Sequence, residues 1–179
     1  PETWTLQWII PLYKKSSVYD AANYRGVHLT AQLSKVMERL LGGLFMPFLI
    51  RNVAFGPNQF AYTPERGARD ALALMALVWI TALSLRSSVE THCSDVAGAF
   101  DRVNLDRLAA KLRAKQIHKE VVDVIVSWLR KRRAHVVVGG DAPKEFELID
   151  MVFQGAVWGP TLWNLFYEDA RMAIQELLY

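Results

Sequence analysis

The stretch SDVAGAFD, residues 94–101, decides which fold we expect for this chain. Residues 89–95 have the length of a β-strand, and their alternation places Val89, Thr91, Cys93 and Asp95 on one side. Asp95 would end this strand, and a tight turn of small residues at 97–99 would follow it. The stretch therefore predicts a carboxylate at a strand end, beside a backbone that a ligand can approach closely.

The side chains of this stretch suit a metal ion and a nucleotide. Aspartate supplies the hard oxygen ligands that Mg²⁺ prefers, and the carbonyl of Val96 can assist it. Phe100 adds a bulky, planar side chain whose shape fits a nucleotide sugar. An aspartate before a glycine-containing turn is also a common turn or helix-cap residue, so the pattern taken alone leaves this simpler interpretation open.

The composition predicts an ordered globular protein of one domain, or of one domain with a partial neighbour. The chain has 179 residues, of which 52% are hydrophobic, and this is enough to bury a core. A single cysteine, Cys93, excludes an intrachain disulfide, and we expect it to be a small core residue. No secretory leader is visible, so we expect an intracellular protein, for which the nucleus is one compatible compartment.

Charge and hydropathy narrow the classes of partner. The net charge of +3 permits a nucleic-acid partner without requiring one. The uncharged run 71–85 is shorter than the roughly 20 residues that span a bilayer, so we predict a buried core helix over 68–87 and no membrane partner. Because the chain begins with Pro1 and ends at Tyr179 inside an expected helix, we interpret it as part of a longer protein.

The first part of the chain predicts a hairpin followed by an amphipathic helix. Residues 4–13 and 26–29 read as strands, with Lys14, Lys15 and Arg25 near the tip or along one face. These cations suit a triphosphate, although solvated loop charges are the simpler explanation. Residues 32–51 carry apolar side chains at helical spacing, and Pro47 should kink or end that helix.

The second part predicts two helices, a hairpin and a last helix. Asn104 is a candidate N-cap for a helix to residue 116, and His118 for one over 119–131. In the latter we expect six apolar side chains to point inward: Val121, Val122, Val124, Ile125, Trp128 and Leu129. Strands at 134–138 and 145–150 flank a glycine turn, and a helix should open at Gly159.

The densest positive run in the chain lies between these elements. It consists of Arg130, Lys131, Arg132 and Arg133. Such a run is either a solvated helix end that complements the helix dipole or a contact to nucleic-acid phosphates. The sequence leaves both interpretations open.

Four motifs in order resemble the reverse-transcriptase domain of non-LTR (LINE-type) retrotransposons. PLYKK at 11–15 and ANYRGVHL at 22–29 resemble the fingers segment of that family, and NQFAYTPERGARDAL at 58–72 is similar to its next conserved block. SDVAGAFDRV at 94–103 resembles the first palm motif, and QGAVWGPTLWNLFYED at 154–169 resembles the motif that follows it. The resemblance implies an α+β right-hand polymerase fragment, with an antiparallel sheet packed on helices. It also implies fingers-like residues at about 1–87 and palm-like residues at about 88–179.

The resemblance implies roles for the candidate residues. Asp95 would be the catalytic metal ligand, assisted by Val96, for Mg²⁺ or Mn²⁺. Phe100 would act as a steric gate under the sugar 2′ position of an incoming deoxynucleoside triphosphate. The remaining expected contacts are Lys14, Lys15 and Arg25 to the triphosphate and Gln154 and Gly155 to the nucleotide and template.

The implied activity is RNA-directed DNA polymerisation, by attack of a primer 3′ hydroxyl on a nucleotide held at two metal ions. The partners would be an RNA template, a DNA primer and deoxynucleoside triphosphates. The second pair of palm carboxylates of that family is absent before Tyr179, so we expect the chain alone to be inactive. Two alternatives remain: a non-catalytic nucleic-acid-binding protein of the same shape, and a helical scaffold that binds a protein partner.

Overall fold

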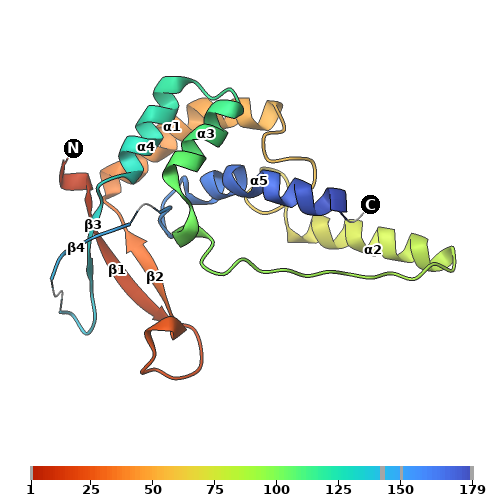
Figure 1. Cartoon of the computed structure of the whole chain (residues 1–179), viewed down its shortest axis with the longest axis horizontal. Helices are drawn as coiled ribbons and strands as arrows, with labels where there is room; N and C mark the ends of the chain where they lie inside the picture. The colour runs from red at the N-terminus through yellow and green to blue at the C-terminus, as the bar shows by residue number, and fades with distance from the viewer. Residues whose placement is uncertain (1, 142–143, 150, 178–179) are drawn as a thin grey trace.

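The computed structural model describes residues 2–141, 144–149 and 151–177. Four strands and five α-helices make up its main elements (Figure 1). The strands are β1 (Leu6–Tyr13), β2 (Tyr24–Leu29), β3 (Arg133–Val136) and β4 (Phe146–Glu147). The helices are α1 (Gln32–Arg51), α2 (Ala68–Ser84), α3 (Leu105–Ala114), α4 (Lys119–Leu129) and α5 (Gly159–Leu177). Short 3₁₀ helices lie at η1 (Glu2–Trp4), η2 (Ala21–Asn23) and η3 (Phe100–Arg102).

The four strands form one mixed sheet in the order β2-β1-β3-β4. Both predicted hairpins are confirmed as antiparallel pairs, β1 with β2 and β3 with β4. The expectation of a wholly antiparallel sheet is wrong for one pair, because β1 and β3 run parallel. The helices between β1 and β3 give the chain enough length to re-enter the sheet in the same direction. Residue 150, the last of the strand predicted at 145–150, lies outside the described residues.

Most of the predicted helices are confirmed, with ends that differ by a few residues at most. Asn104 caps α3 as expected, since its side-chain oxygen accepts a hydrogen bond from the Arg107 amide at 2.9 Å. His118 occupies the N-cap position of α4 without a side-chain hydrogen bond to cap it. Of the six side chains expected to point inward from α4, Val124 is the exception, with 42% of its surface exposed.

The core lies where α1, α3, α4 and α5 meet (Figure 1). Its fully buried members include Leu49 of α1, Leu108 of α3, Ile125 of α4 and Leu162 of α5. Burial of such side chains stabilises the fold by about 1.5–3 kcal/mol each. Since β1 pairs with β3 and α1 packs on α5, the segments 1–87 and 88–179 share both the sheet and the core.

Helix α1 has the predicted boundaries but not a purely apolar buried face. Its buried positions are Ser34, Glu38, Gly42, Phe45 and Leu49, at helical spacing along one stripe. Several leucines of the apolar series face solvent instead, and Leu44 is 76% exposed. Pro47 lies inside the helix, so of the two predicted effects, a kink or an end of the helix, the end is wrong. The buried polar residues of this stripe become important below.

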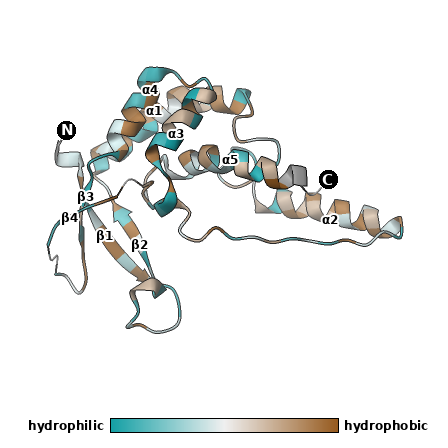
Figure 2. Ribbon diagram, in the orientation of Figure 1, coloured by the Kyte–Doolittle hydropathy of each residue, from teal (hydrophilic) through white to brown (hydrophobic). Residues whose placement is uncertain are grey.

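Helix α2 and the segment after it extend away from the core. Figure 1 shows α2 beside the C-terminal part of α5, with residues 85–97 returning beneath it as an extended chain. Figure 2 shows apolar residues along most of α2, and no residue of α2 is buried. The prediction of a central core helix is therefore wrong, because apolar composition buries a helix only where another element covers it.

The strand predicted at 89–95 is also wrong, since these residues have no regular secondary structure. A strand needs a neighbouring backbone to satisfy its amide and carbonyl groups, and the described elements provide none here. Cys93, predicted to lie in the core, is exposed for the same reason.

No helix in the described ranges is both long enough and apolar enough to cross a membrane.

Candidate functional site

Three of the sequence motifs meet at the loop 152–158, which we call the Gln154 loop. The Val152 amide donates a hydrogen bond to the Phe100 carbonyl at 3.1 Å, which joins the loop to η3. The His28 amide of β2 donates to the Gln154 carbonyl at 2.8 Å. The loop therefore connects the segment 94–101 to the first hairpin, although these parts are far apart in the sequence.

Gly155 is held against β2 in a conformation that suits glycine. Its φ is +114°, and a Cβ built there would lie 2.7 Å from the His28 carbonyl oxygen. Only a residue without a Cβ allows this approach at low cost. The neighbour that approaches Gly155 in the structure is β2, and its expected contact to a nucleotide or template stays a prediction.

Phe100 lies at the start of η3 and packs toward α5. Its ring centroid is 6.1 Å from that of Trp163, and a Cβ on Gly159 would lie 3.5 Å from its ring. The ring is partly buried at the edge of the core. Phe100 is therefore positioned by the same elements that carry the Gln154 loop.

Asp95 lies in the extended segment before η3 and is exposed. Val96 follows it with intermediate exposure, and Gly98 makes the expected turn with φ +61°. Among the described residues, no group of three or more His, Cys, Asp or Glu side chains could hold a metal ion. The described residues thus offer the Asp95 carboxylate and the Val96 carbonyl as oxygen donors but do not complete the ligand set of a divalent metal site.

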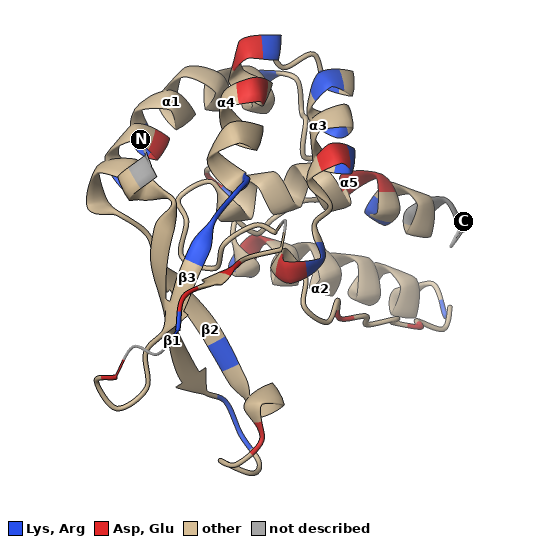
Figure 3. Ribbon diagram, turned by 60° about the vertical axis from the view of Figure 1, so that its left-hand side comes forward, with Lys and Arg blue, Asp and Glu red and all other residues tan. Residues whose placement is uncertain are grey.

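The predicted triphosphate contacts lie at the outer end of the first hairpin. Lys14, Lys15 and Arg25 are all exposed, and the Lys14 amide bonds to the Asn23 carbonyl at 2.8 Å to close the loop. Figure 3 shows basic residues along this loop and on β2. Arg25 is three residues from His28 on β2, a spacing of about 10 Å that places their side chains on opposite faces of the sheet.

The basic run 130–133 separates into different environments. Arg130 pairs with Asp106 at 2.5 Å, and Arg133 pairs with Glu145 at 2.8 Å. Lys131 is exposed, with φ +53°. Figure 3 shows this positive charge at the start of β3.

Arg132 differs from its neighbours because only 3% of its surface is exposed. Its guanidinium donates to the carbonyls of Trp128 and Trp4 and lies 5.0 Å from the centroid of the Trp128 ring. Burial lowers the pKa of Arg132 to about 10, and the nearby charge of Glu38 opposes this shift. Arg132 is therefore not part of a solvated helix end. Because its guanidinium is buried and already bound to backbone carbonyls, it is also unsuited to a phosphate contact.

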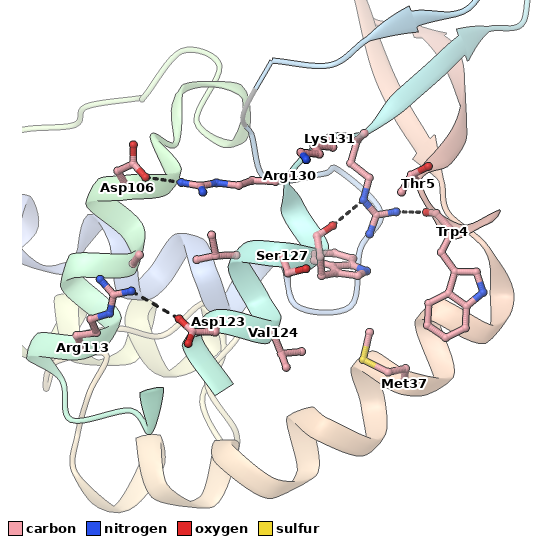
Figure 4. Close-up of a pocket in the computed structure, with 14 residues that line it drawn as sticks. Trp4, Thr5, Met37, Asp106, Arg113, Asp123, Val124, Ser127, Arg130 and Lys131 are labelled. Atoms are coloured by element: carbon pink, nitrogen blue, oxygen red, sulfur yellow. Dashed lines mark hydrogen bonds and ion pairs between the residues drawn. The ribbon is translucent and has the colours of Figure 1, made fainter. Parts of the chain in front are cut away.

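A cavity of about 1150 Å³ lies beside this run. Figure 4 shows Trp4 and Met37 on one side of it and Asp106, Arg113 and Asp123 on the other. The acidic residues are paired, since Arg113 also contacts Asp123 at 3.6 Å. The cavity therefore combines an aromatic wall with Arg113 and Arg130, which already have carboxylate partners.

Glu38 is a buried polar residue that the sequence analysis does not single out. Its side chain is fully buried, and its Oε2 accepts from the amides of Val157 and Trp158 at 2.6 and 3.2 Å. Burial raises its pKa, and these hydrogen bonds and Arg132 oppose the shift. The signal for it in the sequence is a glutamate in the middle of an apolar helical series.

Comparison with known proteins identifies the class of this fold and site. The family described as "Reverse transcriptase (RNA-dependent DNA polymerase)" matches residues 13–177. The chain belongs to the reverse transcriptase family, and its α+β architecture is part of a right-hand polymerase fold.

Curated relatives agree with this assignment. The RNA-directed DNA polymerase from mobile element jockey of Drosophila melanogaster is 28% identical over 94% of this chain and 18% of its own length. The probable RNA-directed DNA polymerases from transposon BS and transposon X-element of the same organism are 25% and 26% identical, each over 94% of this chain and 19% of their own length. The resemblance to non-LTR retrotransposon reverse transcriptases is confirmed, and the chain spans about a fifth of these relatives.

Proposed function

We propose that this chain is the nucleotide-handling and template-handling part of an RNA-directed DNA polymerase. The observation that carries the proposal is the convergence of three family motifs at the Gln154 loop, through hydrogen bonds from β2 and to the Phe100 carbonyl. Those hydrogen bonds give the loop a fixed backbone, which a polymerase needs to hold a nucleotide in an orientation that suits reaction. In this proposal residues 1–87 are fingers-like and residues 88–179 are palm-like.

The nucleotide would lie on the exposed surface that the loop and the first hairpin form together. Gln154 and Gly155 would contact it, Phe100 would exclude a ribose 2′ hydroxyl, and the cations Lys14, Lys15 and Arg25 would attract the triphosphate. An RNA template and a DNA primer would occupy the remaining surface. Of the basic run, we assign phosphate contacts to Lys131 and, in exchange for their carboxylate partners, to Arg130 and Arg133.

Asp95 and Val96 would contribute oxygen ligands to a site for Mg²⁺ or Mn²⁺ in a longer polymerase. When bound, two such ions stabilise the attacking and leaving oxygens of nucleotidyl transfer. Because the described residues do not complete that ligand set, we expect the chain by itself not to polymerise. Further carboxylates would have to come from another part of the polymerase.

Primer extension on an RNA template with magnesium tests the proposal. We expect extension by a longer protein that carries this domain, none by the chain alone, and none by the longer protein with Asp95→Ala, which should still bind primer-template. Extension by the Asp95→Ala variant would remove Asp95 from the site. Salt-sensitive binding of primer-template without extension by any form would favour the non-catalytic alternative.

A further inference from the structure

The start of α5 lacks a capping side chain of its own. The Trp158 carbonyl accepts the first helical hydrogen bond, from Leu162 at 2.9 Å, so Trp158 occupies the N-cap position. Tryptophan cannot accept a hydrogen bond from the free amides of a helix start. The amide of Trp158, at this N-cap, and the amide of Val157, just before it, both donate to the Glu38 carboxylate of α1.

A second contact joins Glu38 to the same residue. The indole Nε1 of Trp158 donates to the Glu38 carbonyl at 2.6 Å. Gly42, one turn further along α1, leaves room for this approach, since a Cβ there would lie 3.3 Å from that indole nitrogen. Trp158 is thus attached to α1 by its backbone and by its side chain.

The Glu38 carboxylate is also held in place from α1 and from the basic run. The Ser34 hydroxyl is 3.5 Å from its Oε1, and Ser34 itself accepts from the Trp128 indole at 2.8 Å. The Arg132 guanidinium lies over the Trp128 ring and provides the opposing charge. A buried carboxylate with these partners has little rotational freedom, which makes it a rigid support.

These contacts support the Gln154 loop from two sides. On one side, β2 holds Gln154 and Gly155 through the backbone of His28. On the other side, Glu38 holds Val157 and Trp158. We propose that Glu38 is a positioning residue: its carboxylate sets the backbone of the Gln154 loop so that Gln154 and Gly155 face the incoming nucleotide.

The inference rests on the proposed function, because it takes Gln154 and Gly155 as nucleotide contacts. It adds that nucleotide affinity depends on a carboxylate in α1 that touches neither the nucleotide nor the primer-template. A purely structural Glu38 would stabilise the fold without selecting the loop conformation. The positioning role predicts that altering the carboxylate in a folded protein changes the loop backbone and the nucleotide affinity. The purely structural role predicts that only the stability changes.

The experiment compares Glu38→Gln, Glu38→Ala and Gln154→Ala with the surface control Glu120→Gln. Glu120 suits the control because its side chain is 87% exposed and undergoes the same loss of charge. Glutamine keeps the length and one acceptor oxygen, so it should rescue part of the effect of alanine. Amide hydrogen exchange is measured across 152–158 in this chain, and KM and kcat for a single deoxynucleotide addition are measured in a longer polymerase that carries it.

We expect faster exchange in 152–158 for both Glu38 variants and a rise in the nucleotide KM of about tenfold for alanine, the scale of one lost charge-assisted hydrogen bond. Glutamine should give a smaller rise. Affinity for primer-template and the results for Glu120→Gln should stay unchanged. If Glu38→Ala does not fold, Glu38→Gln decides the question.

Two outcomes would overturn the inference and remain distinguishable from each other. Unchanged exchange in 152–158 for a folded Glu38 variant, or an unchanged nucleotide KM while Gln154→Ala raises it, would make Glu38 a structural residue only. An unchanged nucleotide KM in Gln154→Ala would instead remove the loop from the nucleotide site, and the proposed function of that loop would fail first.

Discussion

Replacing Gly155 with alanine should destabilise the domain strongly, because two separate costs arise at one position. The residue has φ +114°, a region in which side chains are strained by about 1–3 kcal/mol. The new Cβ would also lie 2.7 Å from the His28 carbonyl oxygen, a backbone atom that cannot rotate away. Moving that backbone adds an overpacking cost of about 1–3 kcal/mol, so we expect a loss of roughly 2–6 kcal/mol in the free energy of unfolding.

Gly43→Ala is the matched control for this change. Gly43 is exposed within α1, and a Cβ there would meet no atom within 4 Å. The same substitution should therefore stabilise the domain by about 0.5–1 kcal/mol through helix propensity. Both free energies can be measured by urea unfolding followed by tryptophan fluorescence, with the buried Trp158 close to the altered loop. Equal unfolding midpoints for the two variants would refute the conclusion that the loop is pressed against β2.

Three further predictions concern a helix cap, a buried histidine and the basic run. Asn104→Ala should reduce the free energy of unfolding by about 0.5–2 kcal/mol, since it removes the cap of α3, and an unchanged urea midpoint would contradict that role. Burial lowers the pKa of His28 below 6.5, so its contribution to stability is complete above pH 6.5 and is lost as the pH falls toward its folded-state pKa. His28→Gln should therefore lose less stability than the unaltered protein when the pH is lowered. The raised pKa of Glu38 has the opposite effect on stability, but it acts equally in both proteins. Parallel plots of unfolding free energy against pH for the two proteins would exclude His28 as the source. Lys131→Glu should weaken binding to any primer-template and reduce the salt slope by about one, whereas an unchanged slope would place Lys131 outside the nucleic-acid contact.

Patterns within a few residues of the sequence correctly predicted several helices and strands. The aromatic and β-branched residues at 4–13, the apolar series at 32–51 and the cap at Asn104 each predicted an element close to the observed one. These features depend on side-chain period and on hydrogen bonds within a few residues of each other. The motifs SDVAGAFD and QGAVWGP also indicated the family correctly. They contain Phe100 and Gln154, which belong to the two segments that the structure joins at the candidate site.

The polar contacts that organise the Gln154 loop could not be predicted in this way. Glu38 and Val157 are far apart in the chain, and no periodic pattern marks one as the acceptor for the other. Arg132 looked like its three basic neighbours, yet its side chain turns inward to Trp128 and Trp4. Both cases depend on which groups the fold brings within hydrogen-bonding distance.

The sequence by itself determined the family, the hairpins and the ranges of most helices, because these follow from motif order and local periodicity. Only the tertiary structure decided which apolar surfaces are covered. Helix α2 has the composition of a core helix but no buried residue, and residues 89–95 have the alternation of a strand but no partner strand among the described residues. Burial and strand pairing are properties of two surfaces in contact, and a sequence pattern describes only one of them.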